Sequence, residues 1–349
     1  MKPQMMIAGL TVCASGAAFA GGVERSAQSV AILFEEGRHV ELSFGHFAPS
    51  VSGTRAGTAS GDMASSYTTV SLGYKMDIGD RMNLALILDQ PIGANVAYPA
   101  GTGYLLQGTT AELTSSAITA LLRYKFDNNV SVYGGLRHET VKGVVSLPFI
   151  DYTLTTNNDT ELGYVVGVAW EKPEIAARVA LTYNSAITHS LDSVEGGDAT
   201  EGFDTEVPQS VNLDFQTGVA KDTLLFGSVR WQEWSAFDID PPNYPFASPL
   251  VSYASDRVTY TVGIGRRFND QWSAAVTASY EDPDGQVTGN LGPTDGFASV
   301  GLAATYTMDK LKITGGLRYV DIGDAITTVA GDFQDNSGVG VGLRIAYSF

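Results

Sequence analysis

The chain ends in the stretch Gly338-Val-Gly-Val-Gly-Leu-Arg-Ile-Ala-Tyr-Ser-Phe349. Apolar residues occupy every second position from Val339 to Phe349, and small or polar residues, including Arg344, lie between them. A period of two is typical of a β-strand with one apolar and one polar face. An apolar face that runs to an aromatic carboxy-terminal residue is expected where lipid covers that face. The stretch therefore predicts a strand of a membrane β-barrel.

The same alternation recurs along the chain, for example in residues 211–219, 258–264 and 311–319. Beyond the N-terminus there is no unbroken apolar run of about 18 residues, which excludes helical membrane spans. Charged residues make up only 17% of the chain, and the formal net charge of −17 argues against a nucleic-acid partner, because phosphates would be repelled. We expect an all-β transmembrane protein.

The N-terminus predicts a secretory signal peptide over residues 1–20. Lys2 supplies positive charge, residues 5–18 are mostly apolar or small, and Ala18-Phe-Ala20 fits a cleavage site. The alternative, an N-terminal membrane anchor, would need a longer apolar run. Cys13, the sole cysteine, lies inside this segment and is not preceded by the small residue that a lipoprotein site requires, so we expect no lipid anchor and no disulfide.

Turn signals predict the number of strands. Six tight polar turns are flanked by alternating segments: residues 79–80, 127–129, 172–174, 221–222, 269–271 and 309–310. Seven longer segments are rich in Gly, Pro, Asp and Thr: residues 49–65, 91–113, 141–159, 186–208, 234–255, 282–295 and 322–336. Six short turns and seven long loops predict an antiparallel barrel of 14 strands over residues 39–349, an even number as bacterial barrels have. The contrast between turns and loops argues against a soluble β-sandwich.

The segment between the signal peptide and the first strand lacks strand alternation. Residues 21–38 mix apolar residues with charge, and they include Arg25, Leu33, Phe34 and Glu35. We expect this segment to lie inside the barrel as a short plug.

Several stretches carry a resemblance to a known family. They are Glu24-Arg-Ser-Ala-Gln-Ser-Val-Ala-Ile-Leu-Phe-Glu-Glu-Gly37, Glu41-Leu-Ser-Phe-Gly45, Pro49-Ser-Val-Ser-Gly53, Asp89-Gln-Pro-Ile-Gly-Ala94, Glu206-Val-Pro-Gln-Ser-Val211 and Tyr319-Val-Asp-Ile-Gly-Asp-Ala325. Together they resemble the FadL/TodX family of outer membrane transporters of long-chain fatty acids and aromatic hydrocarbons. The chain departs from the family in lacking its Asn-Pro-Ala plug motif, near whose place it has Leu33-Phe-Glu35, and it is shorter than the enteric members.

The resemblance implies a monomeric, passive channel for hydrophobic molecules in the bacterial outer membrane, with long-chain fatty acids as the first expectation. Ligand is captured by the outer loops, held at an internal apolar site, and released by plug movement or sideways into the lipid. Its partners are then the hydrophobic ligand, outer membrane lipid and lipopolysaccharide. The barrel-assembly machinery joins them, because the chain's ending resembles the C-terminal signal of outer membrane barrels. The rival hypothesis is a porin that passes small polar solutes.

The resemblance also points to a lateral gate in the third strand. Residues 82–90 run directly into Pro91 and Gly93. Proline removes a ladder donor and glycine permits a bend, which would break the pairing there. The alternative is that Pro91 and Gly93 simply begin the second outer loop.

Loop aromatics predict a capture surface for ligand. Residues 234–246 contain Trp234, Phe237, Tyr244 and Phe246, stiffened by prolines, and Phe149 and Leu105 lie in neighbouring loops. A high density of exposed apolar loop residues is typical of a binding surface. The alternative is that these side chains pack on one another to close the barrel.

Strand parity places seven arginines on the lumen face. Arg123, Arg178, Arg267 and Arg344 lie near the short turns, and Arg137, Arg230 and Arg318 lie higher in the barrel. Buried guanidinium groups need partners. One hypothesis is that carboxylates, with Glu24, Glu35, Glu36 and Asp214 as candidates, pair with them and lock the plug. The other is that the upper three bind a fatty acid carboxylate.

Nothing in the sequence predicts catalysis. The four histidines (His39, His46, His138 and His189) lie outside any nucleophile motif, and no His/Cys/Asp cluster has metal-ligand spacing. We expect no catalytic residue, no metal site and no cofactor.

Overall fold

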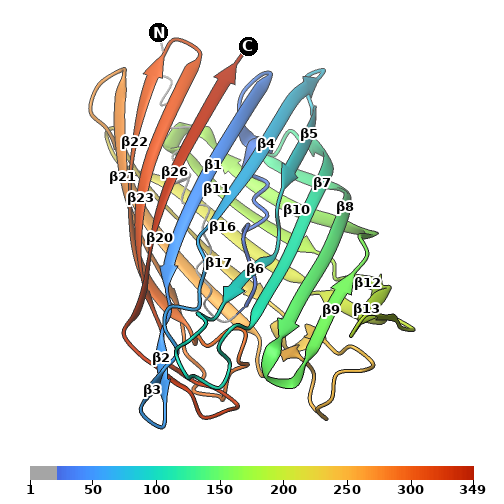
Figure 1. Ribbon diagram of the computed structural model, residues 1–349. Coiled ribbons are helices and arrows are strands. Elements are labelled where there is room, and N and C mark those ends of the chain that lie inside the picture. Colours follow the sequence, from blue (N-terminus) through green and yellow to red (C-terminus); the bar gives the residue numbers. More distant parts are fainter. Residues whose placement is uncertain (1–21) are drawn as a thin grey trace.

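The computed structural model describes residues 22–349 as a closed antiparallel β-barrel (Figure 1). The predicted fold is confirmed, since 14 strands of the described chain form the wall. Their bounds are β1 (His39–Ser50), β4 (Tyr67–Ile78), β5 (Met82–Asp89), β7 (Thr110–Lys125), β8 (Val130–Leu147), β10 (Asp159–Lys172), β11 (Ala177–Asn184), β16 (Ser210–Ala220), β17 (Thr223–Gln232), β20 (Arg257–Arg267), β21 (Trp272–Glu281), β22 (Phe297–Met308), β23 (Leu311–Ile322) and β26 (Asn336–Ser348).

The C-terminal strand closes the wall. β26 pairs with β23 on one side and with β1 on the other, in register from His39↔Ser348 to Ser50↔Ser337. Closure satisfies the backbone groups that a sheet edge would leave unpaired in lipid. The stretch from Gly338 to Phe349 therefore occupies the seam of the barrel.

Short turns and long loops lie at opposite ends, which we call the turn end and the loop end. The six predicted turns each fall at the junction of consecutive wall strands, and a 3₁₀ turn, η3 (Pro173–Ile175), forms one of them. The loop end carries the other elements: β2 (Gly53–Arg55), β3 (Thr58–Ala59), β9 (Tyr152–Thr156), β12 (Ile187–Leu191), β13 (Ser193–Glu195), β14 (Asp198–Ala199), β15 (Phe203–Val207), β18 (Asp238–Ile239), β19 (Val251–Ser252), β24 (Ala325–Ile326), β25 (Asp332–Phe333), η2 (Pro148–Ile150) and η4 (Trp234–Ala236).

Two predicted loop boundaries are wrong. Residues 110–113 and 141–147 belong to strands, because β7 and β8 stay paired from Lys125↔Ser131 to Thr110↔Ser146. Polar outward residues such as Glu112 and Lys142 made these ends look like loop. A strand that rises beyond the apolar belt has no need of apolar outward residues, which explains the error.

The outward face of the barrel is apolar. Large side chains exposed there include Leu122, Leu136, Val166, Leu302 and Leu317, while the alternate positions face the lumen. Trp272 and Tyr306 pack together at the turn end, with ring centroids 5.0 Å apart. An apolar band with aromatic residues at its margin is what lipid and headgroups cover. Within residues 22–349, no helix is long and apolar enough to cross a membrane.

The third wall strand is broken into β5 and β6 (Gly93–Ala97), which Figure 1 shows as separate arrows along β7. β5 pairs with β7 up to Asp89↔Ala117, and β6 pairs with β7 from Gly93↔Thr114. Between these two pairs the third strand advances by four residues and β7 by three. This is a one-residue bulge. Backbone pairing of β4 with the third strand stops at Leu72↔Leu88, and the chain just before β4 pairs with β6 again at the isolated bridge Ala64↔Val96. Between these two points the Val70 amide donates to Gln90 Oε1 at 3.2 Å. We call this interruption of the wall ladder the side opening.

Candidate functional site

The N-terminal segment lies inside the barrel. We call residues 22–38 the plug segment; the predicted signal peptide and Gly21 lie outside the described residues. Its 3₁₀ turn η1 (Ala31–Phe34) buries Ile32 and Leu33, which cluster with lumen-facing side chains of the wall such as Leu121 and Tyr133. Burial of these apolar side chains anchors the turn-end half of the segment in the lumen.

Arg230 joins the plug segment to the wall. Its Nε and Nη2 lie 2.7 Å and 2.6 Å from Glu24 Oε1. The same guanidinium donates to Ser210 Oγ at 3.1 Å and to the Asn212 side-chain oxygen, while Asn212 Nδ2 donates to the Ala27 carbonyl at 3.1 Å. This arginine thus contacts a plug carboxylate, as the plug-locking hypothesis requires.

Arg137 and Arg318 differ in their partners. Arg137 donates to Gln28 Oε1 of the plug segment at 2.6 Å and also to Thr119 and Asn184 of the wall. Arg318 donates to Ser299 Oγ at 2.9 Å and lies 5.3 Å from the Phe297 ring centroid. Of the three upper arginines, Arg137 and Arg230 thus bond to the plug segment.

At the turn end, Phe34 is held between two guanidinium groups. Arg123 and Arg178 each lie 4.4 Å from its ring centroid, and Arg123 Nη1 donates to the Leu33 carbonyl at 3.1 Å. Arg123 also pairs with Glu171 of β10. Sequence reasoning missed Glu171 because a carboxylate one residue from a predicted turn reads as solvated.

The remaining predicted lumen groups lie around the turn end. Arg267 pairs with Asp222 at 2.6 Å and Arg344 lies 3.7 Å from Glu41. A polar cavity with an empty volume of about 2100 Å³ lies beneath the plug segment. Its lining includes Glu35, Glu36, Arg178 and Asp214.

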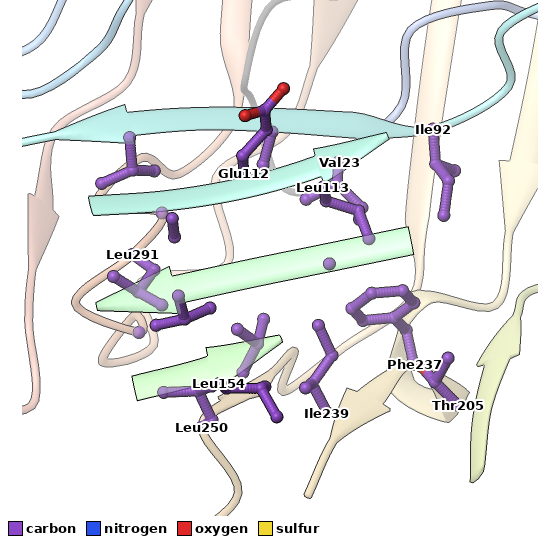
Figure 2. Close-up of a pocket in the computed structure, with 18 of the residues that line it drawn as sticks. Val23, Ile92, Glu112, Leu113, Leu154, Thr205, Phe237, Ile239, Leu250 and Leu291 are labelled. Atoms are coloured by element: carbon purple, nitrogen blue, oxygen red, sulfur yellow. The ribbon is translucent and has the colours of Figure 1, made fainter. Parts of the chain in front are cut away.

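An apolar pocket lies above the plug segment, under the loops (Figure 2), with an empty volume of about 850 Å³. In Figure 2, Ile92 and Phe237 lie at one end and Leu291 at the other, whereas the Glu112 carboxylate points away from the other labelled side chains. Lining residues come from the plug segment, from β6, β7 and β8, and from several segments of the loop end; they include Val23, Ala94, Val96, Leu113, Val141, Leu154, Ile239 and Leu250.

Charge is nearly absent from the pocket lining. Glu112 is its one Asp, Glu, Lys or Arg residue among the described residues. Burial raises the pKa of the Tyr253 hydroxyl, which the Arg257 guanidinium opposes only in part, so this lining phenol is uncharged at neutral pH. Such a lining favours an uncharged, apolar occupant.

The predicted loop-capture residues fall into two groups. Trp234 and Phe237 are only 2% and 1% exposed, so the expectation that they form an exposed surface is wrong. Trp234 instead packs against Phe237 and Tyr253, at 5.6 Å and 5.4 Å between ring centroids, and against Gly22. Short-range aromatic packing closes the loop end at this point, as the alternative hypothesis holds.

The other four predicted loop residues lie nearer the surface. Phe246 and Leu105 are 49% and 41% exposed. Tyr244, partly buried, packs on Phe246 with ring centroids 5.4 Å apart, and Phe149 packs at the edge of the loop-end core. Apolar side chains thus lie both on the outer surface of the loops and on their inner side, which faces the pocket.

Pro91 and Gly93 lie at the break in the third strand and contact the plug segment. The Arg25 and Ser26 amides donate to the Pro91 carbonyl at 2.8 Å and 3.2 Å, and the Gly93 amide donates to the Val23 carbonyl at 2.8 Å. The kinked strand therefore turns toward the lumen and pairs with the plug.

Most of the pocket was not predicted. Ala94, Leu113, Val141 and Leu154 are ordinary apolar strand residues in sequence, and only their inward parity at the loop end marks them. Among residues 22–349, no group of three or more His, Cys, Asp or Glu side chains is placed to hold a metal ion.

Solved structures with the same architecture are channels and transporters. A FadL homologue from Pseudomonas aeruginosa is 16% identical, with a TM-score of 0.73, and the match covers 96% of this chain and 97% of that one. The toluene transporter TodX of P. putida is 12% identical (TM-score 0.68; 96% and 94% covered). The toluene transporter TbuX of Ralstonia pickettii is 12% identical (TM-score 0.65; 96% and 97% covered).

No protein-family model matches the sequence, and no curated protein does. The structural likeness extends over nearly the full length of each compared chain. The chain therefore has the fold of the FadL/TodX outer membrane channels.

Proposed function

We propose that this barrel is a passive uptake channel for hydrophobic molecules in the bacterial outer membrane. The single observation that carries the proposal is the apolar pocket between the loops and a plug segment that occupies the lumen. A pocket of this lining retains an apolar molecule, whereas a porin needs a continuous polar path. Exposed apolar loop residues such as Phe246 and Leu105 supply the first contact for ligand.

The ligand class that the pocket favours is uncharged hydrocarbon. The first expectation from the sequence, a long-chain fatty acid, requires a cation beside the pocket for its carboxylate. Among the described lining residues there is no Lys or Arg, and Arg137 and Arg230 bond to the plug segment. The arginines thus support plug locking more than carboxylate binding.

Release takes one of two routes, movement of the plug segment or passage through the side opening. The plug segment is bonded to the wall at Glu24, Gln28 and Phe34, at both ends and in the middle. The second route would use the interruption of the wall ladder between Leu72↔Leu88 and Ala64↔Val96, next to the bulge at residues 90–92. We therefore propose Pro91 and Gly93 as the hinge of a lateral exit.

Ligand class is tested with matched molecules. We expect p-xylene to displace a neutral fluorescent probe such as 1-aminoanthracene from the detergent-solubilised barrel. Its carboxylate analogue p-toluate should need at least about a tenfold higher concentration, because its charge loses hydration in the pocket. Equal displacement by both molecules would overturn the uncharged class, and displacement by neither would overturn the pocket as a ligand site.

A variant provides the reciprocal test. Leu113→Lys places a cation in the lining and should weaken p-xylene displacement while strengthening that of p-toluate; Leu113→Met is the matched control and should behave like the wild type.

A further inference from the structure

We propose that the lipid-facing wall carries a phospholipid site near the turn end, in which Arg266 binds the phosphate and an apolar groove beside it holds an acyl chain. This site lies on the outer surface of β20 to β23, which Figure 1 shows as neighbours in the wall. It is separate from the pocket and independent of the proposed uptake function.

Arg266 points away from the lumen. It follows Ile264 at the spacing of two that keeps side chains on one face of a strand, and Ile264 is 49% exposed on the outward face. Arg267, with the opposite parity, pairs with Asp222. The side chain of Arg266 is exposed and makes no hydrogen bond or ion pair with any other residue of the described chain. Its charge is therefore available to a molecule outside the barrel.

The depth of Arg266 makes such a partner valuable. Phe268 and the packed pair of Trp272 and Tyr306 mark the aromatic margin of the apolar band. Arg266 lies one row of cross-strand partners inside this margin, opposite Ala274. An arginine at the edge of the hydrocarbon extends toward the headgroups and needs an anionic partner there. A lipid phosphate accepts parallel N–H bonds from the planar guanidinium.

An apolar groove runs across the wall from Arg266. Its floor follows one row of cross-strand partners, Arg266↔Ala274, Ala274↔Ala304 and Ala304↔Gly315, in which every residue after the arginine is small. The next row forms one bank of larger apolar side chains, Ile264, Val276, Leu302 and Leu317, and Phe268 stands on the other side. Among the described lining residues, Arg266 is the one charged group.

Charge complementarity identifies the occupant. Short turns of outer membrane barrels lie on the periplasmic side, so the groove faces the leaflet that holds phospholipid. An acyl chain in the groove contacts the apolar bank, and the phosphate at its head meets Arg266 at the headgroup level. An anionic lipid such as phosphatidylglycerol suits the site better than phosphatidylcholine, because the ammonium group of the latter offsets the attraction to the guanidinium.

The first test is native mass spectrometry of the full chain, released from detergent micelles that contain phosphatidylglycerol or phosphatidylcholine. We expect the wild type to retain phosphatidylglycerol preferentially. Arg266→Gln should weaken its retention by about tenfold or more, because charge-assisted hydrogen bonds are lost. Arg266→Lys keeps the charge without the planar fork and should lie between. Lys172→Gln, which removes another exposed cation at the turn end, is the matched control and should bind like the wild type.

The second test fills the groove and keeps the arginine. Ala304→Leu places a branched side chain on the groove floor and should weaken phosphatidylglycerol binding by about fourfold or more, since displacing one CH₂ group from apolar contact costs about that factor. Ala298→Leu makes the same change on the same strand, at an exposed position outside the groove, and should have no effect. Heat-modifiable gel mobility checks that both variants are folded. Glycerol 3-phosphate, which has no acyl chain, should not displace the lipid at a hundredfold excess.

Three outcomes would overturn the site. Equal retention of phosphatidylglycerol by the wild type and by Arg266→Gln would remove the phosphate contact. Displacement by glycerol 3-phosphate, or unchanged binding in folded Ala304→Leu, would remove the groove. A wild-type dimer without bound lipid that dissociates in Arg266→Gln would show that this face is an interface between two copies of the chain instead.

Discussion

Arg230 and Glu24 illustrate how this barrel accommodates charge in its lumen. Both side chains are largely withdrawn from solvent, and their ion pair is supported by Ser210 and Asn212 on the neighbouring strand. A buried charge that loses its partner costs more than a surface charge, because its hydration is not recovered. Arg267 and Asp222 form a comparable pair at the turn end, where both are partly exposed.

The two pairs should therefore respond differently to mutation. We expect Arg230→Met to lower the free energy of unfolding in detergent by about 3 kcal/mol, because Glu24 is left unpaired in the lumen. Arg267→Met, the matched control at an exposed pair, should cost about 1 kcal/mol or less. The double variant Glu24→Met with Arg230→Met should recover part of the loss. Urea titrations measure all three, and equal losses for Arg230→Met and Arg267→Met would contradict the argument.

At the scale of the element, the third strand is the irregular part of the wall. Inward positions are odd-numbered in β5 and even-numbered in β6, and the bulge at residues 90–92 makes the change. A bulge re-aims side chains and ends pairing locally. Here it turns Ala94 and Val96 into the pocket, and the ladder between β4 and β5 stops nearby, at Leu72↔Leu88.

Removal of the bulge should close the side opening. We expect deletion of Gln90 to bring β6 into continuous register with β5 and to extend pairing to β4, so that hydrocarbon transport falls by about tenfold or more while the barrel stays folded. Heat-modifiable gel mobility reports the fold, and delivery of p-xylene by the reconstituted barrel into lipid vesicles that enclose a hydrocarbon-oxidising reporter enzyme reports transport. Deletion of Gly57, at the tip of the β2–β3 hairpin, is the control. Unchanged transport after a folded Gln90 deletion would count against a lateral exit.

At the scale of the whole molecule, the barrel joins two unlike compartments separated by the plug segment. The compartment at the loop end is the apolar pocket, and that at the turn end is the polar cavity. Leu33 and Ile32 are buried between them. The described residues 22–38 thus fill part of the lumen between the two compartments.

This organisation predicts a low conductance that depends on the plug segment. We expect the intact chain to be nearly silent in planar lipid bilayers, and deletion of residues 22–37 to produce stable ohmic steps, because water then fills the lumen. The Gly57 deletion serves again as the control and should stay silent. Large conductance in the intact chain would favour the rival porin hypothesis.

Much of the architecture could be predicted from the sequence because it depends on local patterns. Alternation from Val339 to Phe349 identifies a half-apolar strand, and polar turns such as Asp309-Lys310 divide the strands. Parity along each strand placed Arg137, Arg230 and Arg318 in the lumen, where they lie. The parity of a residue predicts which face of the strand it lies on, but not which residue it contacts across the lumen. The contact of Arg137 with Gln28 therefore could not be predicted from the sequence.

The sequence by itself determined that this chain is a membrane barrel with 14 strands and an N-terminal segment of a different character. These properties follow from the alternation of apolar and polar residues along each strand and from the residue types of the turns. Both are patterns among residues that are close in sequence. Only the tertiary structure decided that apolar residues from the plug segment, from β6, β7 and β8 and from several loop-end segments meet in one pocket, and that Arg25 contacts Tyr67 and Asn95. The physical reason is that closure of the barrel fixes which distant residues face one another, and no local pattern encodes those distances.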